Sequence, residues 1–260
     1  MATPTVIVDD LHVVYRVYGA GGNKGTAATS LMRLVKRQKR ASIREVHAIR
    51  GISFVANHGD AIGIIGRNGS GKSTLLRAIA GLLPAEEGAV YTGGQAALLG
   101  VNAALLDDLT GERNVVLGCL AMGMQPAEVK ARYEKIVDFS GVGRFIDLPM
   151  RAYSSGMASR LRFAIASAKS HEILMIDEAL ATGDAAFRTK SRDRIQELRS
   201  EAGTVFLVAH NLGEIEENCN RVIWMETGKI IRDSEDVPGV IDEYLIATGG
   251  EPRHREQARL

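Results

Sequence analysis

Cysteine, net charge and long apolar runs are scarce in this sequence, and each scarcity excludes a class of protein. The 260 residues include two cysteines, Cys119 and Cys219, far apart and without the CxxC spacing of a metal site. This excludes a disulfide framework and suits a reducing compartment. The 32 Lys and Arg residues almost balance the 31 Asp and Glu residues, so the chain lacks the basic footprint of a general nucleic-acid binder.

Signals for secretion and for membrane spanning are also missing. No apolar run approaches the roughly 18 to 20 residues that a membrane helix needs. The start, MATPTVIVDD, has no basic stretch leading into an apolar segment, so no secretion signal is expected. No segment repeats at a fixed period, which argues against a solenoid. We expect a soluble chain that works at a membrane only where another protein holds it.

Apolar strands alternate with helical segments along most of the chain. Residues 48–58 and 60–66 read as strands, and residues 112–150 are mostly helical in pattern. Further on, EILMID and TVFLVAH flank an amphipathic stretch, and residues 221–233 read as a hairpin that turns at Thr227-Gly228. Alternation of this kind predicts an α/β fold with a mainly parallel sheet covered by helices. The tail, residues 251–260, is expected to be loose.

A glycine-rich turn between a strand and a helix carries the main chemical signal. Residues 66–74, GRNGSGKST, match G-x-x-x-x-G-K-[ST] in the context that this motif requires. The glycines allow successive N–H groups to face one concavity, where phosphates bind, and the lysine reaches the β- and γ-phosphates. The serine hydroxyl after it suits Mg²⁺. The nucleotide-binding residues predicted here are Gly66, Asn68, Gly69, Ser70, Gly71, Lys72, Ser73 and Thr74.

Polar residues at two strand ends complete a candidate hydrolytic site. EILMIDE delivers Asp177 where a carboxylate can hold Mg²⁺, and Glu178 follows it, placed to act as a general base on water. TVFLVAH ends in His210, on the side of a parallel sheet where ligands bind. Taken alone, His210 would more often be a structural histidine.

Two other segments are open to interpretation. YSSGM, residues 153–157, is a small polar loop that opens onto a helix, a place where anions bind. Residues 24–46 form a basic amphipathic insert, with its charges concentrated over Arg33–Arg40. The insert is either a membrane-surface element or an ordinary solvated helix.

GRNGSGKST, YSSGM, ILMIDE and VAH, in this order and spacing, resemble the nucleotide-binding subunits of ABC transporters over nearly the whole chain. The resemblance implies a P-loop NTPase core of mainly parallel sheet and helices within a single domain, 1–250. It also implies an antiparallel β subdomain and a helical subdomain over about 103–165. ATP and Mg²⁺ are the implied cofactors, and two copies would sandwich two ATP molecules.

The resemblance also implies a role for individual residues. Asp177 and Ser73 would hold Mg²⁺, Glu178 would be the catalytic base and His210 the catalytic switch histidine. Asp184 would be the aspartate of the loop after the base. Tyr15 would stack on adenine, with Tyr18 as the alternative. Either ring could instead have a packing role alone. The γ-phosphate held by the partner copy would meet Ser154, Ser155 and Gly156.

Departures from the common pattern indicate one branch of the family. Gly100 or Val101 falls where a glutamine is usual, Gln95 lies too early to replace it, and Met157 replaces the glutamine of the signature loop. YSSGM, LTGERN, MIDEALATGDAAF and the basic insert resemble ATPase subunits that export lipid-linked polysaccharides: O-antigen, teichoic acid and, most similar, mycobacterial galactan. No added C-terminal carbohydrate-binding domain is expected after Leu260.

The branch implies a set of partners and a location. These are a second copy, an integral membrane permease, a lipid-linked glycan, and a membrane surface met by Arg33–Arg40 at the cytoplasmic face of the plasma membrane. Nucleic acid is not expected. The alternatives are the ATPase subunit of a drug or lipid exporter and, less favoured, a non-transport ABC ATPase acting on nucleic acid or ribosomes. Such non-transport ATPases usually carry two modules or long coiled coils, and this chain shows neither.

Overall fold

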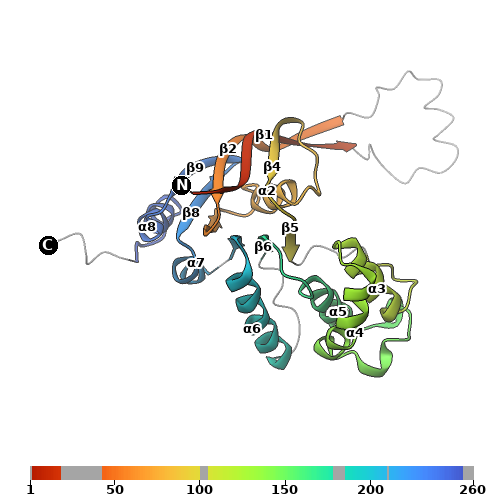
Figure 1. Cartoon of the computed structure of the whole chain (residues 1–260). Helices are drawn as coiled ribbons and strands as arrows, with labels where there is room; N and C mark the ends of the chain where they lie inside the picture. The colour runs from red at the N-terminus through yellow and green to blue at the C-terminus, as the bar shows by residue number, and fades with distance from the viewer. Residues whose placement is uncertain (1, 19–42, 100–104, 178–184, 210, 254–260) are drawn as a thin grey trace, which may run out of the picture.

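The computed structural model describes residues 2–18, 43–99, 105–177, 185–209 and 211–253. Two sheets and a group of helices make up the described parts (Figure 1). In chain order the elements are β1 (Pro4–Tyr18), β2 (Ile43–Asn57), β3 (Ala61–Ile65), α2 (Lys72–Ile79), β4 (Glu87–Thr92), β5 (Ala96–Leu99), α3 (Gly111–Ala121), α4 (Pro126–Ser140), η1 (Gly143–Phe145), η2 (Met150–Ala152), α5 (Ser155–Ala166), β6 (Ile173–Asp177), α6 (Ala185–Glu201), β7 (Thr204–Val208), α7 (Leu212–Asn218), β8 (Arg221–Glu226), β9 (Lys229–Ser234) and α8 (Val237–Ala247).

The larger sheet has the strand order β5-β6-β7-β3-β8-β9, parallel except for the β8–β9 hairpin. Its inner strands are short apolar runs buried on both faces, as strands of parallel sheets are. One face packs against α2, and the other packs against α6, α7 and α8. The carboxyl ends of β3, β6 and β7 therefore meet at one edge, where ligands of such sheets bind.

The smaller sheet is antiparallel, with the order β2-β1-β4. Its two long strands run out past the rest of the fold in Figure 1. Alternate residues of β1 and β2 are buried, among them Val6, Val8, Ile52 and Phe54, and they join the core that covers α2. The helix α2 is thus enclosed between the two sheets.

A bidentate arginine ties the sheets together. Arg221 at the start of β8 donates to both carboxylate oxygens of Asp233 at 2.7 and 2.6 Å. It also donates to the Asp60 carboxylate at 3.2 Å and to the Val55 carbonyl at 2.7 Å. The hydrogen bond to Asp233 is the main reason why the pKa of Arg221 is raised above its usual value. Half-buried bidentate geometry makes this contact more rigid than an exposed ion pair.

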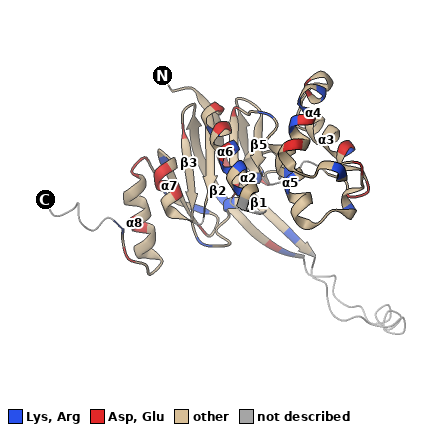
Figure 2. Cartoon of the chain, turned by 90° about the horizontal axis from the view of Figure 1, so that it is seen from below, with Lys and Arg blue, Asp and Glu red and all other residues tan. Residues whose placement is uncertain are grey.

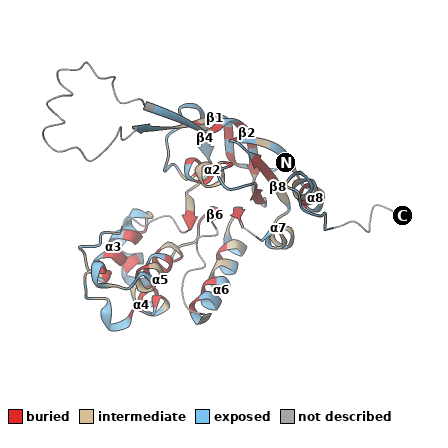
Figure 3. Cartoon of the chain, turned by 180° about the vertical axis from the view of Figure 1, so that it is seen from behind, coloured by how far each residue is buried: buried red, intermediate tan, exposed pale blue. Residues whose placement is uncertain are grey.

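The helices α3, α4 and α5 form a separate group beside β5, with their own buried core (Figure 3). Thr110 caps α3, Pro126 occupies the first turn of α4, and Gly141 ends α4 at φ 63°. Basic and acidic residues both occur along α6 (Figure 2). Within the described ranges no helix has the length and apolar character needed to cross a bilayer.

The structure confirms the mainly parallel sheet and the hairpin that turns at Thr227-Gly228. It adds strands that the sequence did not predict: β1, β4, β5 and the first five residues of β2. β4 is largely exposed and β5 has four residues, so neither carries a readable apolar period. The helices α7 and α8 were missed as well.

Candidate nucleotide-binding site

The turn between β3 and α2 can be built only with glycine at its two ends. Gly66 adopts φ 147°, and a Cβ there would lie 2.2 Å from the Met225 carbonyl oxygen. Gly71 adopts φ 108°, and a Cβ there would lie 2.8 Å from the Ala48 carbonyl oxygen. Backbone from β8 and β2 therefore presses against the turn and fixes its curvature.

The hairpin turn of β8 and β9 supports the same loop from behind. The Gly228 amide donates to the Ser70 carbonyl at 2.9 Å, and the Arg50 amide donates to the Gly228 carbonyl at 2.9 Å. Gly228 itself has φ 81° and lies against Ala48. The phosphate loop is thus bonded to the hairpin turn, and the hairpin turn is bonded in the same way to β2.

The N-terminus of α2 is open toward the cleft. Its N-cap, Gly71, supplies no side-chain cap, and the first turn carries no acidic residue. The first amide groups of a helix point along the axis and carry the positive end of its dipole, so an anion is the expected partner.

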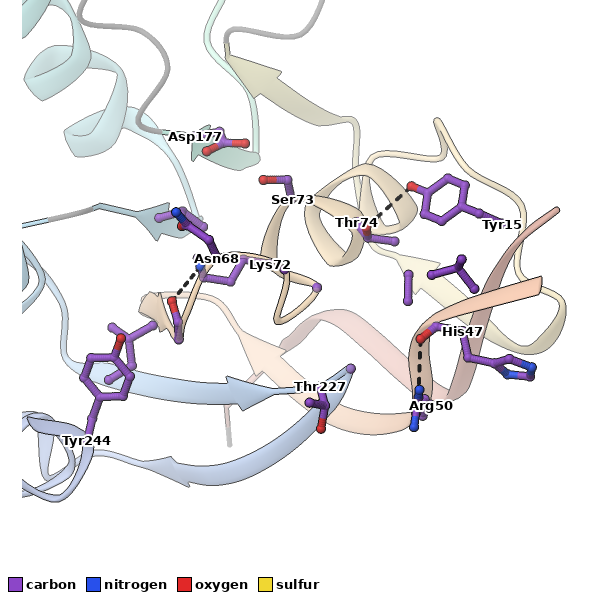
Figure 4. A pocket seen from close by; sticks show the side chains of 18 of the residues that line it. Tyr15, His47, Arg50, Asn68, Lys72, Ser73, Thr74, Asp177, Thr227 and Tyr244 are labelled. Atoms are coloured by element: carbon purple, nitrogen blue, oxygen red, sulfur yellow. Dashed lines mark hydrogen bonds between the residues drawn. The ribbon is translucent and has the colours of Figure 1, made fainter. Parts of the chain in front are cut away.

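Lys72 is folded back onto the loop. Its Nζ donates to the carbonyl oxygen of Gly66 at 2.7 Å (Figure 4). It also donates to the carbonyl oxygen of Arg67 at 3.1 Å. Phosphate oxygens carry charge and are stronger acceptors than these neutral carbonyls. The ammonium group is therefore already positioned over the concavity that a phosphate would fill.

Ser73 and Asp177 face one another across the cleft (Figure 4). Ser73 lies in the first turn of α2, and Asp177 is the last residue of β6, paired with Val208 of β7. A hydroxyl and a carboxylate are hard oxygen ligands, and Mg²⁺ binds through one or two such groups together with phosphates. The residues present fit this cation. In the part of the chain that the structure describes, no cluster of three or more His, Cys, Asp or Glu offers a different metal site.

The cleft around the loop has a volume of about 1060 Å³. Tyr15 lies at one end, and its hydroxyl is 3.4 Å from the Thr74 hydroxyl. Figure 4 shows Tyr244 at the other end, beyond Asn68 and Lys72. The backbone of Tyr18 continues β1 three residues further on. The cleft is also lined by residues that were not predicted as site residues: Val46, His47, Ala48, Arg50, Ile65, Val208, Ala209, Leu212, Thr227, Gly228 and Tyr244.

The YSSGM loop lies elsewhere, at the start of α5 in the helical group. The Ser154 hydroxyl accepts the Met157 amide at 3.2 Å and so caps this helix, and Ser154 and Ser155 are exposed. Neither serine is among the residues that line the cleft, and neither is Gly156. Within one chain the structure does not bring this loop to the nucleotide site.

Several predicted residues lie outside the described ranges: Glu178, Asp184, His210, the positions Gly100 and Val101, and the basic segment Arg33–Arg40. Two described residues precede two of these positions in the sequence: Asp177 comes before Glu178, and Ala209 comes before His210. Both Asp177 and Ala209 line the cleft.

Comparison with known proteins gives consistent relatives. A family model described as ABC transporter matches residues 49–181. An O-antigen export system ATP-binding protein, RfbB, of Klebsiella pneumoniae is 39% identical over 205 residues, which cover 78% of this chain and 83% of that protein. RfbB of Myxococcus xanthus is 40% identical over 87% of this chain and 52% of its own length. The teichoic acids export ATP-binding protein TagH of Enterococcus faecalis is 38% identical over 76% of this chain and 44% of its own length.

Solved structures agree on the fold. A dimeric ATP-binding cassette in a post-hydrolysis state, bound to ADP and Pi, aligns with a TM-score of 0.64 at 20% identity, over 88% of this chain and 97% of that chain. A nucleotide-free ATP-binding cassette from an ABC transporter aligns with a TM-score of 0.59 at 19% identity, over 92% of this chain and 95% of that chain. From the family match over half of the sequence and the relatives near 39% identity, the chain belongs to the ABC transporter family.

Proposed function

We propose that this chain is the ATP-hydrolysing subunit of a polysaccharide exporter. Two copies would bind ATP between them and power the movement of a lipid-linked glycan through an integral membrane permease. The observation that carries the proposal is the cleft, in which a glycine-built phosphate loop, Lys72, Ser73 and Asp177 converge. The names of the relatives, which are O-antigen and teichoic acid export proteins, supply the substrate class. The chain spans about half the length of two of these relatives.

Different residues of the cleft bind different parts of the nucleotide. Tyr15 offers a ring face to the base, while the loop amides and Lys72 take the phosphates. Ser73 and Asp177 would hold Mg²⁺, which neutralises charge on the phosphates when it is bound. These contacts orient the nucleotide with its third phosphate toward the carboxyl end of β6.

Hydrolysis needs groups beyond the described cleft. Glu178, next to Asp177, would take a proton from the attacking water, and His210 would hold the third phosphate. Ser154, Ser155 and Gly156 of a second copy would close over that phosphate, and Asp184 would lie at the contact between copies. The exposed position of Ser154, away from its own cleft, suits a role that only a partner can complete.

The basic segment Arg33–Arg40 would meet the membrane surface at the cytoplasmic face, close to where anionic lipid headgroups enter. Each basic residue near an anionic surface adds about 1 kcal/mol of attraction. Neutralising Arg33, Lys36, Arg37, Lys39 and Arg40 should impair export and leave the basal ATPase intact. Normal export by the neutralised protein would mean that the segment is an ordinary solvated surface segment with no role at the membrane.

Depletion of the protein in its native cell tests the function directly. Polyprenyl-linked glycans are extracted, separated by polymer length and compared with the glycan displayed at the surface. We expect a long lipid-linked polymer to accumulate inside while its surface form declines. If no lipid-linked intermediate changes, the glycan is not the substrate, and a drug or lipid exporter becomes the better description.

A further inference from the structure

Tyr244 reaches the nucleotide cleft from α8, the last helix of the structure. It lies at the end opposite Tyr15, with its hydroxyl turned toward the phosphate loop (Figure 4). Ile65 and Leu212, which also line the cleft, belong to the hydrophobic cluster against which the Tyr244 ring packs. Tyr244 therefore brings a hydroxyl group to the cleft from an apolar cluster.

The ring of Tyr244 is fixed relative to the phosphate loop. It packs edge-on against Trp224, with ring centroids 5.7 Å apart and planes at 78°. Trp224 is the β8 partner of Ile65 in the parallel ladder, and Ile65 directly precedes Gly66. One ring contact and one strand pair thus connect α8 to the first glycine of the loop.

The hydroxyl of Tyr244 has an unused hydrogen-bonding capacity. Among the described residues its backbone carbonyl accepts from Thr248, but its phenol oxygen makes no hydrogen bond. Tyrosine hydroxyls in partly buried positions usually find a partner. A ligand in the cleft can supply one.

We propose that the Tyr244 hydroxyl donates a hydrogen bond, directly or through one water, to the terminal phosphate group of bound ATP. This inference rests on the proposed function, because it takes the base to lie at Tyr15 and the phosphates at the loop. In Figure 4 Tyr244 lies beyond Asn68 and Lys72 as seen from Tyr15, so a nucleotide laid out in that direction carries its third phosphate past Lys72 toward Tyr244. ADP ends one phosphate earlier and would not make the contact. Tyr244 would thus let the chain distinguish ATP from ADP. The position of α8 would also depend on which nucleotide is bound.

The test compares two nucleotides on one conservative variant. Tyr244→Phe keeps the ring that packs on Trp224 and removes only the hydroxyl, so the fold is preserved. Isothermal titration with a non-hydrolysable ATP analogue and with ADP, both with Mg²⁺, gives the two affinities. We expect the analogue to bind about tenfold more weakly and ADP to change by less than about twofold, as loss of a hydrogen bond to a charged group predicts. The control is Tyr91→Phe, which removes a hydroxyl from a side chain that is 60% exposed on β4.

Two further results separate this inference from the function on which it rests. If Tyr244→Phe leaves the ratio of the two affinities unchanged, the hydroxyl does not contact the third phosphate and the inference is wrong. Lys72→Met is titrated beside it. If Lys72→Met weakens both nucleotides while Tyr244→Phe changes no ratio, only the role of Tyr244 is lost. If Lys72→Met changes neither affinity, the nucleotide site itself is misassigned.

Discussion

Replacing Lys72 by methionine should weaken ATP binding by about 30-fold. In the free chain Nζ of Lys72 makes two hydrogen bonds to neutral carbonyl oxygens, those of Gly66 and Arg67. Binding would exchange them for two bonds to phosphate oxygens. The donor is charged in both states, so only the acceptor changes: a bond from an ammonium group to a neutral oxygen contributes about 2 kcal/mol and one to a charged phosphate oxygen about 3 kcal/mol. The exchange of two bonds therefore gains about 2 kcal/mol, or about 30-fold in affinity. Methionine has a similar length and no charge, so it removes the gain without leaving a cavity.

Isothermal titration with a non-hydrolysable ATP analogue measures this difference. Lys130→Met is the matched control, because Lys130 is an exposed lysine on α4, away from the cleft. Thermal unfolding of both variants shows whether the fold is kept. An Lys72→Met affinity within about twofold of the parent would refute the reasoning, since two phosphate contacts cannot cost so little.

Three other changes have defined outcomes. Glu178→Gln should keep ATP binding and lose steady-state hydrolysis. It should accumulate as an ATP-bound dimer, which size-exclusion chromatography detects. An ATP turnover near the parent value would mean that another group is the base. Ser154→Ala should lower the free energy of unfolding in urea by about 1 kcal/mol, because it removes the cap of α5, whereas Ser155→Ala, which removes no cap, should change it less. Burial, and then Lys169, lower the pKa of His171 to about 4, so the native state favours the neutral ring. The unfolded chain takes up this proton below about pH 6.5, and stability is therefore lost as pH falls from about 6.5 toward 4. His171→Leu should flatten that loss between pH 7.5 and pH 5 in urea unfolding, and the exposed His58→Leu should not; an unchanged slope in His171→Leu would assign the acid sensitivity elsewhere.

The local parts of the site could be predicted from the sequence, and the distant parts could not. The phosphate loop and Asp177 depend on short motifs that combine a buried strand with the polar group that follows it, so they can be recognised within a dozen residues. His47, Arg50, Thr227 and Tyr244 reach the cleft only because the antiparallel sheet, the β8–β9 hairpin and α8 pack around the loop. The sequence marks Thr227 as part of a turn, but nothing near any of the four marks it as part of the site. The same holds for β4, whose exposed residues follow no period and which is placed by pairing with β1.

The backbone hydrogen bonds that support the phosphate loop affect the order in which the protein folds. Ser70 is bonded to Gly228, and Gly228 to Arg50, so the loop reaches its final shape only when segments from both ends of the chain have come together. Contacts between such remote segments form late, because the chain entropy of closing large loops must be overcome first. During refolding, the ability to retain a fluorescent nucleotide should therefore return after most of the helical circular dichroism signal. Nucleotide binding would then report the completion of the last step of folding.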